Sequence, residues 1–468
     1  MIYDLAIIGG GSAGLSIAAA AAQFGEKVVL FEKGEMGGDC LNSGCVPSKA
    51  LIAAAKYAHA QRSSAPYGVA AVEPKVDYAK VIDHVHGVIG KIAPNDSVER
   101  FEGLGVKVVK APAAFVSARM LEAGGQRFEA RKIVIATGSR AGLPPVPGLK
   151  DVPYLTNETL FQNRVMPEHL IIIGGGPIGM EMAQAHRRLG CKVTVLEAFK
   201  AMAKDDPEMT SVVLDAIRAE GVDIRENCRI ASVTQQNAQI TVALATGEMI
   251  VGSHILVAAG RVPNVEGLNP EAGGVAFDKR GITVDSGLRS TSNRSVYAAG
   301  DVAGGLQFTH VAGYHAGLII RNAMFRLPVK NRTDIIPWVT YTDPELAHVG
   351  VTEADARKML GAAVKILKWH FAENDRAQAE GKTKGLIKLV VLKGRIIGAS
   401  IVGPSAGELI TPFVLMITQK LKISALANLV LPYPTLSEIG KRAAITNYSG
   451  LAQKPSTRWV LGLLKIFG

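Results

Sequence analysis

Two stretches of the chain place apolar runs and glycines in the same order. The first begins with the apolar run YDLAII at residues 3–8, passes through glycines into the alanine-rich stretch GLSIAAAAAQFG, and ends in KVVLFE at residues 27–32. Short apolar runs beside glycines are typical of buried strands, whereas longer runs of small apolar residues are typical of helices. This pattern predicts a strand, a tight turn, a helix and a second strand.

The same pattern returns at residues 169–197 as HLIIIGGGPIGMEMAQAHRRLGCKVTVLE. A proline-rich stretch, LPPVPGLKDVP at residues 143–153, precedes it and follows the motif ATG at residues 136–138. Proline and glycine in such numbers interrupt regular structure. We therefore expect a domain boundary near residue 150.

Both stretches carry glycines at the spacing G-x-G-x-x-G and an acidic residue at the end of the second strand. The glycines are Gly9, Gly11 and Gly14 in the first stretch and Gly174, Gly176 and Gly179 in the second. The spacing permits a tight turn, close approach of a pyrophosphate and close packing of helix on strand, while Glu32 and Glu197 can accept hydrogen bonds from a ribose. Two complete units predict two bound dinucleotides.

The region after about residue 333 has a different pattern. Residues 385–403, GLIKLVVLKGRIIGASIVG, predict two strands joined by a Lys-Gly turn, and residues 407–420 predict one amphipathic helix. No nucleotide fingerprint occurs there. We expect an α+β domain, which could form an oligomer interface.

Composition narrows the class of protein. The 468 residues include 50 glycines and carry a net charge of +11, which favours anionic partners such as dinucleotide phosphates, acidic lipid or an acidic protein. No helix-turn-helix, RNP or zinc-finger pattern and no long Lys/Arg run occurs, so nucleic acid is not expected as a partner. The sequence predicts a soluble α/β protein of two to four domains.

Only four cysteines occur, which is too few for a secreted disulfide scaffold of this length. The N-terminus lacks the basic region and cleavage site of a signal peptide, and no run of about 18 apolar residues predicts a membrane-spanning helix. These features predict a reducing compartment and a cytoplasmic protein.

Cys40 and Cys45 lie in the stretch GGDCLNSGCVPSK at residues 37–49. Zinc sites usually offer C-x2-C pairs or four nearby ligands, and neither occurs here, so no metal site is predicted. Residues five apart on a regular helix point apart, so a disulfide needs the irregular turn that the glycines and Pro47 permit. The position just after the first dinucleotide unit favours a redox pair beside a flavin, although metal ligation and two structural thiols remain as alternatives.

At this point the chain resembles the FAD-dependent pyridine nucleotide-disulfide oxidoreductases, the family of dihydrolipoamide dehydrogenase, glutathione reductase and mercuric reductase. The resemblance covers essentially the whole chain. It rests on GGGSAG, GGDCLNSGCVPSK, ATG, GGGPIGME, AAGRVPN at residues 258–264, VYAAGD at residues 296–301 and PYPTLSE at residues 432–438.

The resemblance implies an α/β fold with two Rossmann-like domains and a C-terminal α+β dimerisation domain, hence a homodimer. It implies FAD binding by residues 1–150, NAD(P) binding by residues 151–262, a return to the FAD domain over residues 263–332 and an interface domain over residues 333–468. The implied cofactors are FAD and NAD(P). Electrons would pass between NAD(H), FAD and a Cys40–Cys45 disulfide.

The resemblance also implies roles for single residues. Cys45 would form the charge-transfer thiolate beside the flavin and Cys40 would be the interchange thiol. Lys49 and Glu181 would form the ion pair beside the isoalloxazine. The FAD and NAD motifs would further contribute Thr137, Gly138, Gly260 and Asp301, the last to the FAD ribityl chain.

Glu197 would accept hydrogen bonds from an NAD ribose and repel the 2′-phosphate of NADP, so NADH is favoured over NADPH. Basic residues nearby leave this preference open, because folding could bring one of them to that phosphate. They are His186, Arg187, Arg188, Lys200 and Lys204.

The C-terminal motif departs from the family pattern. Tyr433 occupies the place of the histidine that serves as base in the lipoamide and glutathione enzymes, while the glutamate that orients it is retained as Glu438. A phenol with an ordinary pKa near 10 is a poor base at pH 7. Efficient lipoamide turnover is therefore not expected.

A tyrosine at that place is similar to mercuric reductase, but the C-terminal Cys-Cys pair of that enzyme has no counterpart here. We expect a mercuric reductase-like electron route to an unidentified small-molecule, thiol, lipoyl or metal-ion acceptor. The alternatives are a dihydrolipoamide dehydrogenase and a membrane-associated quinone or metal reductase.

The last segment, residues 456–468, is apolar and basic. Its apolar side chains are Trp459, Val460, Leu461, Leu463, Leu464, Ile466 and Phe467, and its charges are Arg458 and Lys465. It is too short to span a bilayer. It either docks on its own protein or dimer partner, or forms a peripheral membrane contact.

Overall fold

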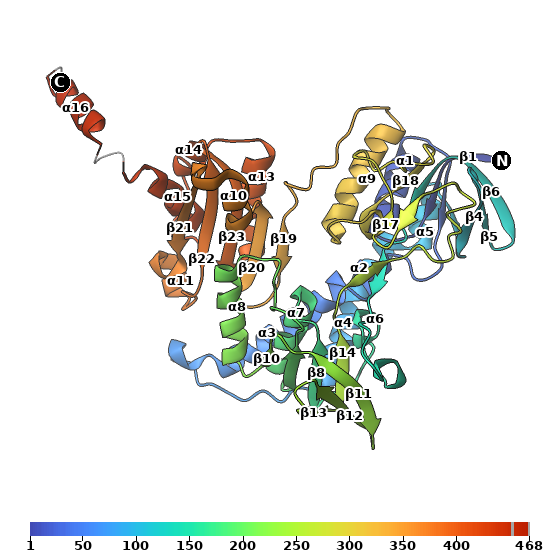
Figure 1. Cartoon of the computed structure of the whole chain (residues 1–468), viewed down its shortest axis with the longest axis horizontal. Helices are drawn as coiled ribbons and strands as arrows, with labels where there is room; N and C mark the ends of the chain where they lie inside the picture. The colour runs from blue at the N-terminus through green and yellow to red at the C-terminus, as the bar shows by residue number, and fades with distance from the viewer. Residues whose placement is uncertain (451–453, 467–468) are drawn as a thin grey trace. The chain divides into compact units, whose positions relative to one another are not determined.

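The structure, a computed structural model, describes residues 1–450 and 454–466. The chain divides into two compact units. The first combines Met1–Ala201 with Val222–Asn331, and the second combines Met202–Gly221 with Arg332–Gly468. Figure 1 labels many of the helices and strands of both units, and its colours follow the chain from the N-terminus to the C-terminus.

A seven-stranded sheet forms the centre of the first half of unit one, in the order β3-β2-β1-β6-β5-β4 with β18 also paired to β6. Five strands run parallel, and β4 and β5 add an antiparallel edge. The strands are β1 (Ile2–Ile8), β2 (Val28–Phe31), β3 (Lys107–Val109), β4 (Ala113–Ser117), β5 (Met120–Ala123), β6 (Gln126–Ile135) and β18 (Val296–Ala298). The predicted first strand, turn, helix and second strand therefore form as expected.

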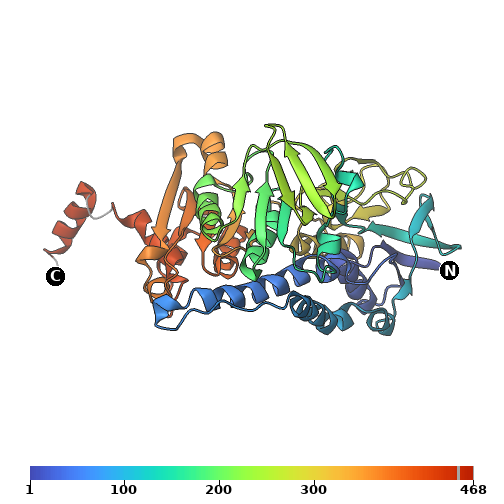
Figure 2. The same ribbon diagram turned by 90° about the horizontal axis from the view of Figure 1, so that it is seen from below.

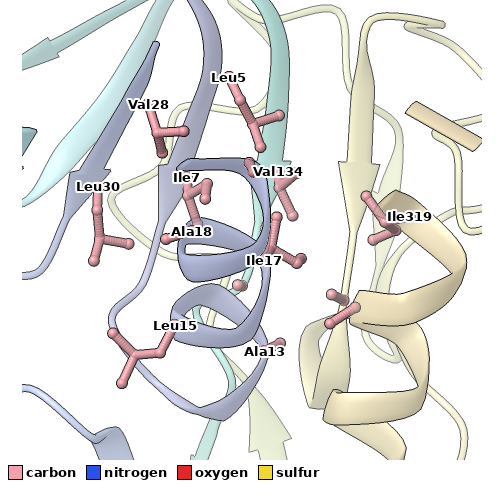
Figure 3. Packing of buried hydrophobic residues seen from close by; sticks show 14 of the residues in the cluster. Leu5, Ile7, Ala13, Leu15, Ile17, Ala18, Val28, Leu30, Val134 and Ile319 are labelled. Atoms are coloured by element: carbon pink, nitrogen blue, oxygen red, sulfur yellow. The ribbon is translucent and has the colours of Figure 1, made fainter. Parts of the chain in front are cut away.

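Helix α1 (Ser12–Gln23) packs on this sheet and against α9 (Thr309–Ala323), which lies beside it (Figure 3). Figure 3 shows Ile17 and Ala18 of α1 in a fully buried layer, with Ile319 of α9 contributing from the other helix. The run of alanines keeps the helix thin, so that it packs closely on both neighbours. This packing brings α9, which begins at residue 309, into the same core as the first glycine turn.

The second parallel sheet of unit one has the order β10-β9-β8-β14. Its elements are β8 (His169–Ile173), α7 (Pro177–Leu189), β9 (Lys192–Leu196), β10 (Asp223–Arg225) and β14 (His254–Val257). An antiparallel sheet follows, made of β11 (Ile230–Gln236), β12 (Gln239–Leu244) and β13 (Met249–Gly252). This is the second dinucleotide-type fold that the sequence predicts.

Helix α3 (Cys45–Arg62) joins the two halves of unit one, because it packs against both α4 (Tyr78–Ile92) and α7. Figure 2 shows α3 as a long helix. Shorter connecting elements complete the unit. They are α2 (Gly38–Asn42), α5 (Val98–Gly103), α6 (Asn157–Leu160), β7 (Ser139–Ala141), β15 (Arg261–Pro263), β16 (Phe277–Asp278) and β17 (Gly281–Ile282).

Unit two is built on an antiparallel five-stranded sheet in the order β19-β20-β23-β22-β21. The strands are β19 (Trp338–Thr340), β20 (Glu345–Gly350), β21 (Val364–His370), β22 (Leu386–Leu392) and β23 (Arg395–Gly403). Its helices are α8 (Pro207–Ala219), α10 (Glu353–Leu360), α11 (Asp375–Ala379), α12 (Ala406–Leu409), α13 (Thr411–Thr418), α14 (Ile423–Ala427), α15 (Glu438–Ile445) and α16 (Pro455–Leu464).

The strand pair predicted at residues 385–403 is present as β22 and β23, joined at Lys393 and Gly394. The single helix predicted over residues 407–420 is wrong, because α12 and α13 are separated at Ile410. Pro412 stands in the first turn of α13. A proline has no backbone N–H and is best tolerated there, which favours a new helix start over a continuous helix.

Helix α8 belongs to the sheet of unit two, although it lies between β9 and β10 in the sequence. Lys388 on β22 has a side chain only 4% exposed, and its Nζ contacts Asp206 at 2.7 Å, Glu208 at 2.7 Å and Glu353 at 2.8 Å. A buried ammonium needs such partners, because an unpaired charge in the interior is strongly destabilising. This ion cluster ties the start of α8 to the sheet.

The C-terminal segment forms helix α16 as far as Leu464, and every described side chain on it is exposed or half-buried. Trp459 is 69% exposed and Ile466 is 78% exposed. Phe467 and Gly468 lie outside the described residues. Among the helices of residues 1–450 and 454–466, none has both the length and the apolar character needed to cross a membrane.

Candidate active site

The first glycine turn is shaped by close backbone contacts. Gly9 has φ 113°, and a Cβ there would lie 2.3 Å from the Ala136 carbonyl oxygen. A Cβ on Gly14 would lie 1.9 Å from the Gly9 carbonyl oxygen. At Gly11 the nearest neighbour is 3.8 Å away, so space remains in front of this residue. The first and third glycines therefore serve the fold, and the second leaves room for a ligand.

The second glycine turn repeats this geometry within a few degrees and tenths of an ångström. Gly174 has φ 111°, and its Cβ would lie 2.4 Å from the Ala258 oxygen. The Cβ of an alanine at Gly179 would lie 2.0 Å from the Gly174 oxygen, whereas no atom lies within 4 Å of that position at Gly176. The two predicted fingerprints thus form equivalent turns.

Glu32 and Glu197 are held beside these turns by backbone N–H groups. The Glu32 carboxylate accepts from Gly10 N and from Gly34 N, each at 2.6 Å. Glu197 accepts from Gly175 N at 2.7 Å and from Phe199 N at 2.9 Å. Both carboxylates are thereby oriented at the end of the second strand, where a ribose is expected.

Several helices of unit one begin without a side-chain cap in the part of the chain that the structure describes. They are α1, α3, α7 and α9, whereas Asp77 caps α4. Uncapped N–H groups at a helix N-terminus form a ready site for an anion. The starts of α1 and α7 follow the two glycine turns, so these residues fit the pyrophosphates of two dinucleotides.

Asp301 follows β18, in the motif VYAAGD. Its Oδ2 accepts a hydrogen bond from Ser139 Oγ at 2.5 Å, and burial raises the pKa of its carboxyl. Thr137 Oγ1 donates to the Asn264 carbonyl oxygen at 2.6 Å. Gly138 and Gly260 both have positive φ, of 67° and 117°. These predicted cofactor residues therefore lie in segments of unit one that connect or follow its strands.

Cys40 and Cys45 are free thiols that interact with each other across an irregular turn. Cys40 lies in the short helix α2, and Cys45 is the first residue of α3. Ser43 and Gly44 separate the two helices, so the sulfurs are not splayed apart as they would be on one regular helix. The Cys45 sulfur also lies 3.2 Å from Thr309 Oγ1 at the start of α9.

The two thiols differ in acidity. The hydrogen bond from Cys40 is the main cause that lowers the pKa of Cys45 to about 6, with help from Thr309 and the Lys49 charge and against the effect of burial. The same hydrogen bond, with burial, raises the pKa of Cys40. The start of a helix adds a further stabilisation of a thiolate. At neutral pH the pair therefore holds one thiolate, Cys45, and one thiol, Cys40.

Lys49 lies one helical turn after Cys45 and forms an ion pair with Glu181 of α7 at 2.8 Å. The Glu181 side chain is 7% exposed and that of Lys49 is 39% exposed. This pair joins the thiol helix to the second dinucleotide fold. The predicted partners are therefore in contact.

Tyr433 and Glu438 lie in unit two. The Tyr433 side chain is exposed, its hydroxyl donates to Asp375 Oδ2 at 2.8 Å, and this hydrogen bond raises the pKa of the phenol. Glu438 begins α15 and is half-buried. A phenol with a raised pKa holds even less of its basic form, the phenolate, at neutral pH than an ordinary tyrosine does.

Three residues near the thiols were not identified from the sequence. Thr309 contacts Cys45, and Arg261 forms an ion pair with Asp39, the residue before Cys40. Arg261 and Asp39 both lie inside motifs on which the resemblance rests. An acidic residue next to a redox cysteine could have been identified from the sequence. Thr309 follows its motif by eight residues, and no sequence pattern marks it.

Of the basic residues that left the nucleotide preference open, two are inside the fold. His186 is fully buried and Arg188 is 5% exposed. Tyr78 hydrogen-bonds His186 Nε2 at 3.2 Å, and burial lowers the pKa of that imidazole to about 4. His186 is therefore neutral near pH 7 and is no partner for a phosphate.

Two family models match this chain, one over most of unit one and the other within unit two. The family model described as "Pyridine nucleotide-disulphide oxidoreductase" matches residues 3–316, and the model of the dimerisation domain of that family matches residues 336–444. The predicted α/β fold class with a C-terminal dimerisation domain is therefore confirmed. The dimerisation domain supports a homodimer.

Three similar proteins illustrate the range of enzymes that this chain resembles. A mercuric reductase of Streptomyces lividans is 35% identical over 464 residues, covering 96% of this chain and 97% of the relative. A dihydrolipoyl dehydrogenase of Thermus scotoductus is 35% identical, covering 93% and 95%. The Cu(II) complex of the HOCl-induced flavoprotein disulfide reductase RclA from Escherichia coli has a TM-score of 0.85 and 27% identity, covering 94% of this chain and 99% of that one.

Proposed function

The chain belongs to the pyridine nucleotide-disulphide oxidoreductases, and from that premise we propose how its residues carry electrons between NAD(H) and an acceptor. It is an FAD-dependent flavoprotein enzyme. When bound, FAD would supply the two-electron chemistry that links hydride transfer from a nicotinamide to the reduction of a disulfide. We assign FAD to the turn at Gly9, Gly11 and Gly14 and the nicotinamide dinucleotide to the turn at Gly174, Gly176 and Gly179.

The unequal acidity of Cys40 and Cys45 is the observation that carries the redox assignment. Cys45 holds the negative charge of the reduced pair, and Cys40 keeps the proton. Lys49 stabilises that charge, and the buried Glu181 holds Lys49 in place. We therefore assign Cys45 as the charge-transfer thiolate and Cys40 as the thiol that meets the acceptor.

The domain roles follow the same assignment. Residues 1–150 and 263–332 would bind FAD, residues 151–262 would bind the nicotinamide dinucleotide, and residues 333–468 would form the interface. Asp301 would present a carboxylate oxygen for the hydroxyls of the flavin chain, and Thr137, Gly138 and Gly260, which lie just before β7 and β15, would complete this site. Ser139 fixes the orientation of that carboxylate.

We propose NADH as the preferred reductant. Both oxygens of Glu197 already accept backbone N–H groups, so the carboxylate is fixed beside the second glycine turn. A fixed carboxylate accepts from the 2′-hydroxyl of an NAD ribose and repels the 2′-phosphate of NADP. Lys200 forms a distant ion pair with Glu226, at 3.9 Å, which lessens its availability for a phosphate.

Stopped-flow reduction by NADH tests the thiol assignment. The FAD-loaded protein should develop a long-wavelength absorbance band from the Cys45 thiolate, and Cys45→Ser should abolish it. Turnover with an acceptor that needs the thiols should fall by about two orders of magnitude or more, as when a nucleophile is removed. The matched control is Cys228→Ser, which removes a half-buried thiol elsewhere in unit one. A band that persists unchanged in Cys45→Ser contradicts the assignment.

We propose a soft metal ion bound to thiols as the acceptor class. The Streptomyces lividans relative is a mercuric reductase, and the Escherichia coli neighbour forms a Cu(II) complex. Thiolates suit soft cations, and delivering electrons to a metal ion needs no base of near-neutral pKa. The Tyr433 hydroxyl donates a hydrogen bond to Asp375, and this arrangement is compatible with an acceptor that needs no base.

A lipoyl substrate is the second candidate, because a dihydrolipoyl dehydrogenase is 35% identical to this chain. Thiol exchange with lipoamide needs a base, which Tyr433 does not supply at neutral pH. We expect slow lipoamide turnover by the natural chain and faster turnover by Tyr433→His. NADH oxidation by mercuric ion with excess thiol, cupric and ferric chelates, lipoamide, glutathione disulfide and quinones ranks the classes directly. Fast lipoamide turnover that Tyr433→His abolishes would establish the lipoyl function instead.

We also propose a cytoplasmic location with peripheral membrane contact through α16. Lys454, Arg458 and Lys465 are spaced four and seven residues apart, so at about 100° per residue they share a stripe about 40° wide. The opposite arc carries apolar side chains that are all exposed, namely Trp459, Val460, Leu463, Leu464 and Ile466. Residues 439–468 contain no Asp or Glu. A basic stripe opposite an apolar arc is suited to an anionic lipid surface.

Vesicle flotation tests this contact. The full chain should float with vesicles containing phosphatidylglycerol and much less with pure phosphatidylcholine, because the basic stripe needs anionic lipid. The double change Trp459→Ser and Leu463→Ser should lower the floated fraction about tenfold, since it removes two large apolar anchors. Met359→Ser, at an exposed apolar residue elsewhere in unit two, is the control. Unchanged flotation, or loss of the dimer in the double variant, would show that α16 has another role.

A further inference from the structure

The carboxylate of Asp39, directly before Cys40, is held by three separate segments of unit one. Its Oδ1 accepts from Ser43 Oγ at 2.8 Å and from Asn157 Nδ2 at 2.7 Å, and its Oδ2 lies 3.0 Å from Arg261 Nη2. These partners come from the thiol turn, from α6 and from β15. A side chain fixed from three directions carries a charge whose position does not change as the thiols react.

The turn between the two cysteines closes over this carboxylate. A Cβ on Gly44 would lie 2.9 Å from the Asp39 carbonyl oxygen and 3.1 Å from its Oδ2. Only glycine leaves the turn this close to the carboxylate at no cost. The chain between Cys40 and Cys45 is therefore folded around the Asp39 side chain.

Arg261 links Asp39 to the carboxylate that we assign to the flavin chain. Its side chain is 14% exposed, and it donates through Nε to Ser139 Oγ at 2.7 Å and through Nη2 to the Ser139 carbonyl at 3.0 Å. Ser139 Oγ in turn donates to Asp301, whose Oδ2 lies 3.7 Å from Arg261 Nε. One guanidinium thus contacts two carboxyl groups, so its positive charge is shared between Asp39 and Asp301.

The charged and titratable groups that act on Cys45 come from each packed element. Helix α2 contributes Cys40 and Asp39, α3 contributes Lys49, and α9 contributes the Thr309 hydroxyl. Lys49 is itself paired with Glu181 of α7. Lys49 favours the thiolate, and Asp39 is the group whose charge opposes it.

We propose that Asp39 is a positioning residue that sets the reducing power of the thiol pair, by placing a fixed negative charge beside the thiolate. This inference rests on the proposed redox role of Cys40 and Cys45. A hydride brings two electrons and one proton, so reduction of the disulfide breaks the S–S bond and gives the Cys40 thiol and the Cys45 thiolate. A nearby negative charge disfavours the thiolate product. It therefore makes the reduced pair a stronger electron donor to the acceptor.

The test is a pH titration of the long-wavelength absorbance band in the NADH-reduced, FAD-loaded protein. Asp39→Asn keeps the size of the side chain and removes its charge, so the pH of half-maximal band intensity should fall by about half a unit or more. The equilibrium constant for reduction of the disulfide by dithiothreitol should rise about threefold, which is the same shift expressed as a ratio. Asp39→Ser provides a second neutral side chain and should shift both quantities in the same direction.

Ser43→Ala is the matched control, because it removes a hydrogen bond to the same Asp39 carboxylate and leaves the charge in place. It should leave the band titration within about 0.2 units of the natural protein, since only the charge is expected to matter. If Asp39→Asn titrates like the natural chain, or shifts only as much as Ser43→Ala, Asp39 has a structural role alone. If the natural protein shows no band at all, the redox assignment of the pair fails first, so the two failures are distinguishable.

Discussion

The two dinucleotide folds of unit one are nearly identical in their turns and differ in what surrounds them. The first and third glycines make the same close contacts in both, and Glu32 and Glu197 accept equivalent backbone N–H groups. Around the first turn, however, α1 is an uncharged, alanine-rich helix, and the thiol helices follow β2 directly. The second turn leads into α7, which buries Glu181, and β9 is followed by α8 of unit two.

This difference shows which part of the fold selects the chemistry. The glycine turn supplies a place for a pyrophosphate and does not select between ligands that share this group. By our assignment, the residues that distinguish a flavin site from a nicotinamide site lie outside the turn, at the thiol helices and at the ends of β18 and β9. Changes at equivalent positions of the two folds should therefore separate the shared role from the particular one.

The largest effect is expected where the two turns are most alike. Gly179→Ala would place a Cβ 2.0 Å from the Gly174 oxygen, so the helix must move and the apoprotein should lose about 2–3 kcal/mol of stability. Gly14→Ala should do the same in the first fold. Chemical unfolding followed by circular dichroism measures both. Gly176→Ala is the control, because its Cβ meets no atom within 4 Å and should leave apoprotein stability unchanged. Equal stability of Gly179→Ala and Gly176→Ala would contradict this account of the turn.

An intermediate effect is expected at the two acidic strand ends. Glu197→Ala should raise the kcat/KM ratio of NADPH over NADH by about tenfold, because a charged hydrogen bond to the ribose and a repulsion are both lost. Glu32→Ala should leave that ratio unchanged and should instead loosen the flavin, seen as faster loss of flavin absorbance on dialysis. Steady-state kinetics with both nucleotides is the measurement. A ratio that changes in Glu32→Ala and not in Glu197→Ala would reverse the assignment of the two folds.

The smallest effect is expected at the ion pair that joins the two folds. Lys49→Gln removes a positive charge that lowers the pKa of Cys45, so the pH of half-maximal band intensity should rise, by about half a unit. Glu181→Gln leaves Lys49 without its carboxylate partner, so the thiolate should become more stable and the band should persist to lower pH. A shift of the same sign in both variants would show that the pair acts through packing and not through charge.

Much of the site could be predicted because its signals are local. The glycine spacing, the acidic strand ends and the two cysteines each lie within a few residues of the element that uses them, so backbone sterics alone constrain them. The bend between Cys40 and Cys45 was also expected, since one regular helix would hold the sulfurs apart. Fold class followed from two copies of one apolar pattern.

The remaining features depend on contacts between distant parts of the chain. Arg261 forms an ion pair with Asp39, although more than 200 residues separate them in the sequence, and the Tyr433 hydroxyl donates a hydrogen bond to Asp375. The membership of α8 in unit two depends on carboxylates that meet Lys388 far along the chain. Tertiary packing decides such pairs, and no periodicity in one sequence encodes them. The interruption before α13 has a local signal in Pro412. The apolar pattern around this proline is typical of a helix and therefore predicted one continuous helix.

The uncapped starts of α1 and α7 mean that the protein is completed by the molecules it binds. Each helix leaves N–H groups that a pyrophosphate would satisfy, so a bound dinucleotide adds to the stability of the folded chain. Newly made chains would reach full stability only as flavin becomes available, and chains without it would be the first to unfold and be degraded. The amount of this enzyme in a cell would then follow the supply of its cofactor as well as the rate of its synthesis.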